Sequence, residues 1–292
     1  MNYALGVDIG GTKVAIGIIR EDGRVMKEIM ISSNPVSAEA MYGVVEESME
    51  TIWNQNEYPI QGIGVGLPGK VNRKEGIAVY QNNLPWRDFP IAERIKEKFL
   101  LQNVLVDNDV STAAYAEWFA HHPVSNETFV YITVSTGIAS AAICDGIPLD
   151  GAGFSGELGL MYVKNYQEES SYERLENISS GTAIKKAMNN EFDAKQVFEQ
   201  YHKGDKKAIH IIDSRIKSLA DGVYSLACIL DPDKMVFGGS IINNQPFIIE
   251  KIKCEIERLV IPEQYNLLDR LYVSKYQGNS GIIGAGLKVL QK

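Results

Sequence analysis

The chain has 292 residues, 45% of them hydrophobic and 23% charged, and its 29 Lys and Arg against 37 Asp and Glu give a formal net charge of −8. This length and apolar content exclude intrinsic disorder and suit either two domains or one large domain. The acidic balance argues against a nucleic-acid partner, because nucleic-acid binders usually carry a basic field over their contact face.

The hydropathy pattern predicts no membrane segment. No stretch approaches the roughly 20 apolar residues that a membrane helix needs, and the N-terminus reaches Asp8 too early for a signal peptide. We therefore expect a cytoplasmic protein without a membrane partner. Cys144, Cys228 and Cys254 are far apart and form no Cys-x-x-Cys pair, so we expect them to pack as small hydrophobic side chains, with no disulfide and no structural zinc.

The first predicted elements form an antiparallel meander of three strands. Apolar runs cover Tyr3–Ile9, Val14–Ile19 and Val25–Ile31, and the last two are separated by Glu21-Asp22-Gly23. An Asp-Gly pair between two apolar runs is the strongest short-range signal for a hairpin. The chain therefore opens with a meander whose first turn contains Gly10-Gly11.

The rest of the first half alternates helices and strands. Helical periodicity or composition predicts helices over Ser37–Trp53, Ile91–Leu101 and Val110–Ala120, and apolar runs predict strands over Gln61–Leu67 and Asn103–Asp107. Alternation of this kind is typical of the α/β class.

The second half repeats the opening pattern. An apolar strand over Phe129–Val134 is followed by the turn Ser135-Thr136-Gly137, a strand over Ile138–Ile143 and a turn at Asp145-Gly146. When Gly137 is set against Gly11, strand, small-residue turn, strand and Asp-Gly turn align in both copies. The repeat indicates either two ordinary hairpins or, as we favour, a duplicated domain.

The remaining elements continue the α/β alternation. Predicted helices cover Ile209–Leu230, Pro246–Leu259 and Gly281–Leu290, and predicted strands cover Met235–Phe237 and Leu271–Ser274. The first of these strands enters a third glycine turn.

Three glycine turns at strand ends point to phosphate binding, because a backbone without Cβ can approach a phosphate and direct several N–H groups at it. The first turn, Asp8-Ile9-Gly10-Gly11-Thr12-Lys13, adds a carboxylate suited to Mg²⁺ and Thr and Lys donors for phosphate oxygens. A hairpin follows it, so it is neither a Walker loop nor a Rossmann fingerprint. Taken alone it could be a structural hairpin, but together with Ser135-Thr136-Gly137 and Gly238-Gly239-Ser240 it favours nucleotide binding.

One acidic segment allows two interpretations. In Val106-Asp107-Asn108-Asp109, either Asn108 or Asp109 could cap the following helix. An Asp at the C-terminal end of a strand also suits a base that accepts a hydroxyl proton, and Asn108 could both donate to and accept from a sugar hydroxyl.

Together these motifs resemble the ROK family, which contains bacterial sugar kinases and sugar-responsive repressors. The likeness rests on the first turn, on Val106-Asp107-Asn108-Asp109 and on Gly153-Phe154-Ser155-Gly156-Glu157-Leu158-Gly159, and it extends in order to Gly238-Gly239-Ser240 and Gly284-Ala285-Gly286. It implies a duplicated, ribonuclease H-like, two-lobe fold of the actin-like ATPase type, with ATP and Mg²⁺ between the lobes. The N-terminal lobe would cover residues 1–112 with the C-terminal helix 281–292, and the second lobe residues 113–280.

The resemblance also implies roles for single residues. Asp8 would help to place Mg²⁺, and Asp109 would be the catalytic base that takes the proton from a sugar hydroxyl, usually O6. The phosphates of ATP would be lined by Gly10, Gly11, Thr12, Lys13, Ser135, Thr136 and Gly137, and the nucleoside by Gly238 and Gly239. The sugar would be bound by Asn83, Asn108, Asp109, Glu157 and Glu176, with Gly69 in a loop beside it.

The chain departs from the family pattern near the sugar. Leu160 stands where the family often has a His, and Tyr166–Glu173 replaces the cysteine-rich zinc motif. The flank that follows keeps Glu176. Without this His and the zinc motif, the sequence does not determine which sugar is the substrate. Glucose, other hexoses, N-acetylhexosamines and β-glucosides all stay candidates. The second turn also has fewer glycines than the family prefers, which could lower the affinity for ATP.

We therefore expect an ATP-dependent kinase for a hexose or N-acetylhexosamine, with the sugar as its small-molecule partner and, as is common in the family, a homodimeric assembly. One alternative is a sugar-binding protein with little or no turnover. A sugar-responsive repressor would need a helix-turn-helix ahead of the first glycine turn, and Asp8 comes too early for one.

Overall fold

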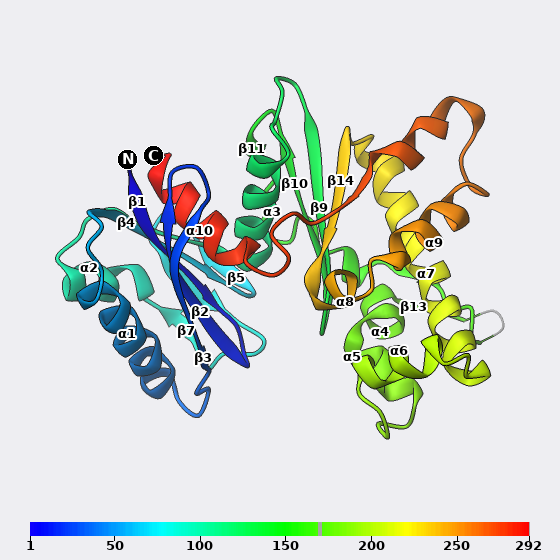
Figure 1. Ribbon diagram of the computed structural model, residues 1–292, viewed down its shortest axis with the longest axis horizontal. Coiled ribbons are helices and arrows are strands. Elements are labelled where there is room, and N and C mark those ends of the chain that lie inside the picture. Colours follow the sequence, from blue (N-terminus) through cyan, green and yellow to red (C-terminus); the bar gives the residue numbers. More distant parts are fainter. Residues whose placement is uncertain (169–170, 292) are drawn as a thin grey trace. The chain divides into compact units, whose positions relative to one another are not determined.

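The computed structural model describes residues 1–168 and 171–291, and its helices and strands form two compact units (Figure 1). Unit 1 comprises Met1–Pro123, Asp150–Phe154 and Asn279–Lys292, and unit 2 comprises Val124–Leu149 and Ser155–Gly278. Within the segment that replaces the zinc motif, residues 169 and 170 lie outside the described residues, as does residue 292.

Unit 1 is built on a five-stranded sheet in the order β3-β2-β1-β4-β8. The predicted meander is confirmed, because β1 pairs antiparallel with β2 and β2 with β3, whereas β4 and β8 run parallel to β1. The strands are β1 (Tyr3–Ile9), β2 (Lys13–Arg20), β3 (Val25–Ser32), β4 (Ile60–Leu67) and β8 (Val104–Asn108).

Helices cover both faces of this sheet. Alternation along β1 sends Leu5, Val7 and Ile9 into a core shared with α1 and α2, while Gly6 faces α10. The helices of unit 1 are α1 (Ala38–Asn54), α2 (Ile91–Phe99), α3 (Asp109–Ala120) and α10 (Ser280–Leu290). A small sheet of β5 (Lys70–Asn72), β6 (Ile77–Tyr80) and β7 (Arg87–Phe89), which the sequence analysis did not predict, completes the unit.

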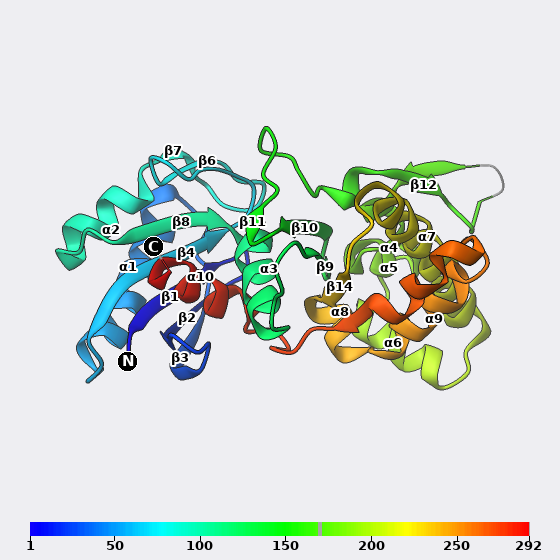
Figure 2. The ribbon, with the colours of Figure 1, turned by 90° about the horizontal axis from the view of Figure 1, so that it is seen from above.

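The C-terminal helix α10 packs on the sheet and on α3 through glycines (Figure 2). A Cβ atom at Gly6 would lie 1.9 Å from the carbonyl oxygen of Ile282, and one at Gly64 would lie 1.8 Å from that of Ala285. On the helix itself, a Cβ at Gly284 would lie 1.7 Å from the carbonyl oxygen of Thr112 in α3. The missing side chains let backbone pack directly on backbone.

Gly284→Ala is therefore expected to destabilise the protein by about 1–3 kcal/mol or more, because two backbones would have to separate. Gly43→Ala is the matched control, since Gly43 also lies in a helix but no atom of the described residues lies within 4 Å of its Cβ position. There the gain in helix propensity is expected to stabilise the fold by roughly 0.5–1 kcal/mol. Urea denaturation measures both changes, and equal effects of the two substitutions would be inconsistent with this packing.

Unit 2 repeats the topology of unit 1. Its sheet has the order β11-β10-β9-β14-β15, with β9 and β10 antiparallel and β14 and β15 parallel to β9. The strands are β9 (Thr128–Val134), β10 (Ile138–Cys144), β11 (Ile147–Pro148), β14 (Lys234–Gly238) and β15 (Leu271–Val273). A hairpin followed by parallel strands on the side of its first member occurs in both units, which confirms a duplicated domain over two unrelated hairpins.

The helices of unit 2 were only partly predicted. The long helix α7 begins at Lys206, where the Asp205 side chain accepts a hydrogen bond from the Ala208 N–H. The helices are α4 (Leu175–Ser179), α5 (Gly181–Ala187), α6 (Ala194–His202), α7 (Lys206–Leu230), α8 (Gly239–Asn244) and α9 (Phe247–Ile256). Two 3₁₀ segments, Leu158–Leu160 and Pro262–Arg270, and a hairpin of β12 (Tyr162–Lys164) and β13 (Tyr172–Arg174) complete the unit.

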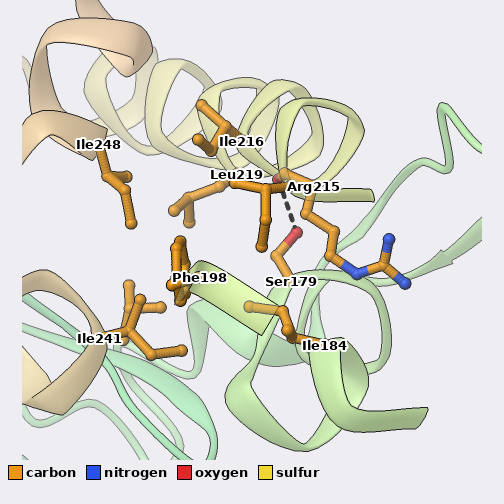
Figure 3. Close-up of a pocket in the computed structure, with 10 residues that line it drawn as sticks. Ser179, Ile184, Phe198, Arg215, Ile216, Leu219, Ile241 and Ile248 are labelled. Atoms are coloured by element: carbon orange, nitrogen blue, oxygen red, sulfur yellow. Dashed lines mark hydrogen bonds between the residues drawn. The ribbon is translucent and has the colours of Figure 1, made fainter. Parts of the chain in front are cut away.

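The core of unit 2 contains a cavity of about 20 Å³, lined mainly by isoleucines and Phe198 (Figure 3). The backbone of Arg215 borders it, with the Ser179 hydroxyl donating to the Arg215 carbonyl at 2.8 Å, and the guanidinium points away from it. Burial lowers the pKa of Arg215 to about 10. A cavity of this size holds at most a water molecule, so it is not a substrate site.

Two expectations need revision. Cys228 and Cys254 are exposed and Cys144 is only partly buried, so the prediction that all three pack as core residues is wrong; α7 and α9 turn two of these positions to solvent. The division into units also keeps α3 whole in unit 1, through Pro123, whereas the predicted boundary after residue 112 would cut this helix. Among the described residues no helix is both long and apolar enough to cross a membrane.

Candidate functional site

In unit 1, the turn between β1 and β2 presents backbone donors. The Gly10 N–H donates to the Lys13 carbonyl at 2.9 Å, and the Ser33 hydroxyl donates to the Gly10 carbonyl at 2.6 Å. The N–H groups of Gly11 and Thr12 meet no acceptor in the described part of the chain. The turn is therefore braced at its ends and has two N–H groups available to a ligand.

Asn83 lies directly against this turn. A Cβ atom at Gly11 would come within 2.6 Å of the Asn83 Cβ, so only glycine fits at position 11. The Asn83 side chain is exposed. A candidate phosphate turn and a candidate sugar-binding residue are thus in contact within unit 1.

Asp8 and the start of α3 meet at one edge of the sheet. Register aligns Asp8 with Gly66 of β4, and Gly66 with Asp107 of β8. Because β1, β4 and β8 are parallel, their carboxyl ends share this edge, and a Cβ at Gly66 would lie 3.5 Å from the Asp109 Cα. Burial and the nearby Asp109 carboxylate raise the pKa of Asp8 to about 7, partly offset by Lys13.

Asn108 caps helix α3. Its side-chain oxygen accepts hydrogen bonds from the N–H groups of Val110 and Ser111, at 3.0 and 3.2 Å, so the predicted cap is confirmed at Asn108. Its amide nitrogen also donates to the Gly69 carbonyl at 3.2 Å. The Asp109 carboxylate accepts from the Val110 N–H at 2.9 Å. The loop of Gly69 and the start of α3 are therefore joined, which places three predicted sugar-side residues together.

Asp107, which the sequence analysis assigned no role, is the buried anchor of this edge. It is 2% exposed and forms ion pairs with Arg73 and Lys288. Burial opposes its ionisation, but the charges of Lys288 and Arg73 outweigh burial and hold the pKa of Asp107 below its ordinary value. A buried carboxylate needs charged partners. The position of Asp107 at the end of an apolar strand is the sequence signal that could have predicted such partners.

In unit 2, the turn Ser135–Gly137 also connects two antiparallel strands, and it is one residue shorter than the first turn. The Ser135 N–H donates to the Gly137 carbonyl at 2.9 Å, while no acceptor for the N–H groups of Thr136 and Gly137 exists among the residues described. The start of α5 braces the turn from behind, because the Gly181 N–H donates to the Ser135 carbonyl at 2.8 Å and the Thr182 hydroxyl to the Thr136 carbonyl at 2.9 Å.

The third glycine turn lies beside the second. Gly238 is in register with Thr133 of β9, two residues before Ser135 of the second turn. Gly239 has a φ of 88°, and a Cβ there would lie 2.5 Å from the Val134 carbonyl oxygen. Both the backbone conformation and the close approach require glycine. The candidate phosphate and nucleoside residues of unit 2 are therefore adjacent.

Two carboxylates, Glu157 and Glu176, are among the candidate site residues of unit 2. Oε2 of Glu176 accepts a hydrogen bond from the Ile138 N–H at 2.9 Å. Partial desolvation and the neighbouring Glu176 carboxylate raise the pKa of Glu157. The side chain of Leu160 is 46% exposed. Among the residues that the structure covers, no three His, Cys, Asp or Glu side chains are grouped so that they could hold a metal ion.

A sequence model of the ROK family matches residues 4–292. The chain belongs to the ROK family. Glucokinases from Halalkalibacterium halodurans and Thermotoga maritima are 24% and 25% identical to it, and the matches cover 99% and 96% of this chain and 96% and 95% of theirs. An N-acetylmannosamine kinase from Salmonella typhi is 26% identical, with 97% of each chain covered.

Solved ROK structures share the fold. A ROK family glucokinase from Streptomyces griseus, in complex with glucose and AMPPNP, superposes with a TM-score of 0.84 at 22% identity, with both chains fully covered. A ROK hexokinase from Thermus thermophilus gives 0.81 at 26% identity, covering 99% of this chain and 98% of its own. The expected α/β actin-like ATPase fold is thereby confirmed.

Proposed function

We propose that this ROK protein is an ATP-dependent sugar kinase that phosphorylates a hexose or N-acetylhexosamine at O6. The observation that carries the proposal is the edge of the unit 1 sheet, where Asp8, the N–H groups of Gly11 and Thr12, and Asp109 lie together with Asn83 and Asn108. The relatives named glucokinase and N-acetylmannosamine kinase support it.

The two turns would hold the phosphates of ATP. Gly11 and Thr12 in unit 1, and Thr136 and Gly137 in unit 2, offer backbone N–H groups without protein acceptors, and such groups stabilise charge that spreads over phosphoryl oxygens. Lys13 is exposed beside the first turn and would add a positive charge. Gly238 and Gly239 would face the nucleoside.

Asp8 fits a magnesium ion. Its carboxylate is a hard oxygen ligand, and its raised pKa reflects burial beside a second carboxylate, a situation that a bound cation would relieve. A magnesium ion there would neutralise phosphate charge during transfer.

Asp109 would act as the base. In this proposal its carboxylate accepts the proton of the sugar O6 hydroxyl while that oxygen attacks the terminal phosphorus of ATP, and the bond from this phosphorus to the bridging oxygen breaks to release ADP. Asn83 and Asn108 would orient the sugar from unit 1, with Gly69 in the adjoining loop, and Glu157 and Glu176 would do so from unit 2. Leu160 cannot provide the polar contact of a His, so sugar selectivity would rest on these residues.

Mass spectrometry of reaction products tests the proposal. The chain is incubated with ATP and Mg²⁺ and separately with glucose, other hexoses, N-acetylmannosamine, N-acetylglucosamine and β-glucosides. We expect a sugar monophosphate from at least one of them. Sugar binding by calorimetry without any phosphorylated product would instead identify a sugar-binding protein that has lost turnover.

A further inference from the structure

Glu176, one of the candidate sugar-binding residues, holds the second phosphate turn, Ser135–Gly137, through a hydrogen bond. Ile138, which follows the turn directly, donates its backbone N–H to Oε2 of Glu176 at 2.9 Å. Hydrogen bonds to an ionised acceptor are among the stronger ones in proteins. The carboxylate therefore fixes the exit of the turn, while α5 fixes the carbonyl oxygens of Ser135 and Thr136.

Glu176 also lies close against the turn. A Cβ atom at Gly137 would be 2.4 Å from the Glu176 Oε2, and one at Gly159 would be 3.1 Å from the Glu176 Cβ. Gly137 has no positive φ, so backbone strain does not require glycine here, and a Cβ would meet only the carboxyl end of the Glu176 side chain. A side chain at residue 137 would push Glu176 away from the Ile138 N–H.

The two oxygens of the Glu176 carboxylate differ, because only Oε2 accepts the hydrogen bond from the Ile138 N–H. Within the described residues no group donates to its Oε1, and an ionised carboxylate can accept on both oxygens. Unit 1 has a related contact, where Gly11 lies against Asn83. In both units, a glycine of the turn therefore lies against a candidate sugar-binding residue: Gly11 against Asn83, and Gly137 against Glu176.

We propose that Glu176 is a positioning residue for the phosphate turn, in addition to any contact with the sugar. By holding the Ile138 N–H, it keeps the Thr136 and Gly137 N–H groups in the geometry that receives phosphate oxygens. Oε1 remains available to a sugar hydroxyl, so one side chain links the two substrates. This inference rests on the proposed kinase function and adds that the affinity for nucleotide depends on Glu176 even when no sugar is bound.

The test measures the dissociation constant of a non-hydrolysable ATP analogue with Mg²⁺ in the absence of sugar. For Glu176→Gln, a neutral acceptor replaces a charged one, and we expect the affinity to fall about three- to tenfold. Gly137→Ala should have a similar effect because it displaces the carboxylate. Both remove the same interaction, so the double variant should be little worse than the poorer single variant.

Glu173→Gln is the matched control. Glu173 lies three residues upstream and, among the residues described, accepts hydrogen bonds only from the Arg174 N–H and the Asn177 side chain, so this variant should bind the analogue like the wild type. Thermal unfolding of each variant verifies the fold, and Glu176→Gln is isosteric.

The outcomes separate this inference from the proposed function. Wild-type-like affinity or tighter binding in Glu176→Gln, with a wild type that binds the analogue, would overturn the positioning role and leave the kinase proposal intact. If the wild type itself failed to bind the analogue, the proposed function would fail, and the inference with it.

Discussion

Asp109→Asn is expected to slow sugar phosphorylation by about 10²–10⁴-fold, the usual contribution of a positioned general base. The amide has nearly the same shape but cannot take a proton from the sugar hydroxyl. It can still accept the Val110 N–H, which bonds the Asp109 carboxylate at 2.9 Å, so α3 should begin at the same residue. The dissociation constant of the sugar should therefore change little, and steady-state kinetics should show the loss in kcat.

A second Asp→Asn change at the start of a helix controls for general effects. Asp205 caps α7, is exposed and is not one of the candidate site residues. Because Asn caps a helix as well as Asp does, Asp205→Asn should leave kcat and stability unchanged. A kcat for Asp109→Asn within a few-fold of the wild type would exclude Asp109 as the base.

Asp8→Asn should also abolish most of the activity, and it should stabilise the protein when no nucleotide is bound. The pKa of Asp8 is raised from 3.8 to about 7 in the folded chain. The folded state therefore holds a proton that the unfolded state releases, so stability is highest below pH 4 with respect to this group and falls as the pH rises toward 7. Asn carries no such charge, and the expected gain above pH 7 is roughly 2–4 kcal/mol.

Urea denaturation of wild type and Asp8→Asn at pH 5 and pH 8 checks the sign. The stability advantage of the variant should grow between the two pH values, while activity with Mg²⁺ and ATP is lost in the variant at both. An advantage that shrinks with rising pH would mean that Asp8 is ionised and well paired in the folded chain, and a variant with wild-type activity would rule out a role in placing the metal.

The main sheets could be predicted from the sequence because local signals agree with the fold. Apolar runs and Asp-Gly turns identify β1–β3 and the hairpin of β9 and β10, and the repeated pattern anticipates the shared topology. The short strands β5, β6 and β7 and the helices α4 to α6 were missed. Helix α4 has only five residues, of which Leu175, Ile178 and Ser179 are buried, so tertiary packing determines it more than propensity.

The candidate site divides in the same way. Glycine turns and a carboxylate at a strand end have local signatures, and the structure places Asp8, Asn83, Asn108 and Asp109 together in unit 1. The structural role of Asp107 could not be predicted, because its partners Arg73 and Lys288 are far away in sequence. The bond from Ile138 to Glu176 spans 38 positions. Such long-range contacts form only in the folded chain, and no local pattern of residue types predicts them.

Sugar-stimulated release of ADP by the intact chain, followed in a coupled assay with ATP and Mg²⁺, tests the kinase proposal most directly. We predict release well above the sugar-free rate for at least one hexose or N-acetylhexosamine, with one ADP formed per sugar phosphate. Release that no sugar of the panel raises above the sugar-free rate would contradict a sugar kinase.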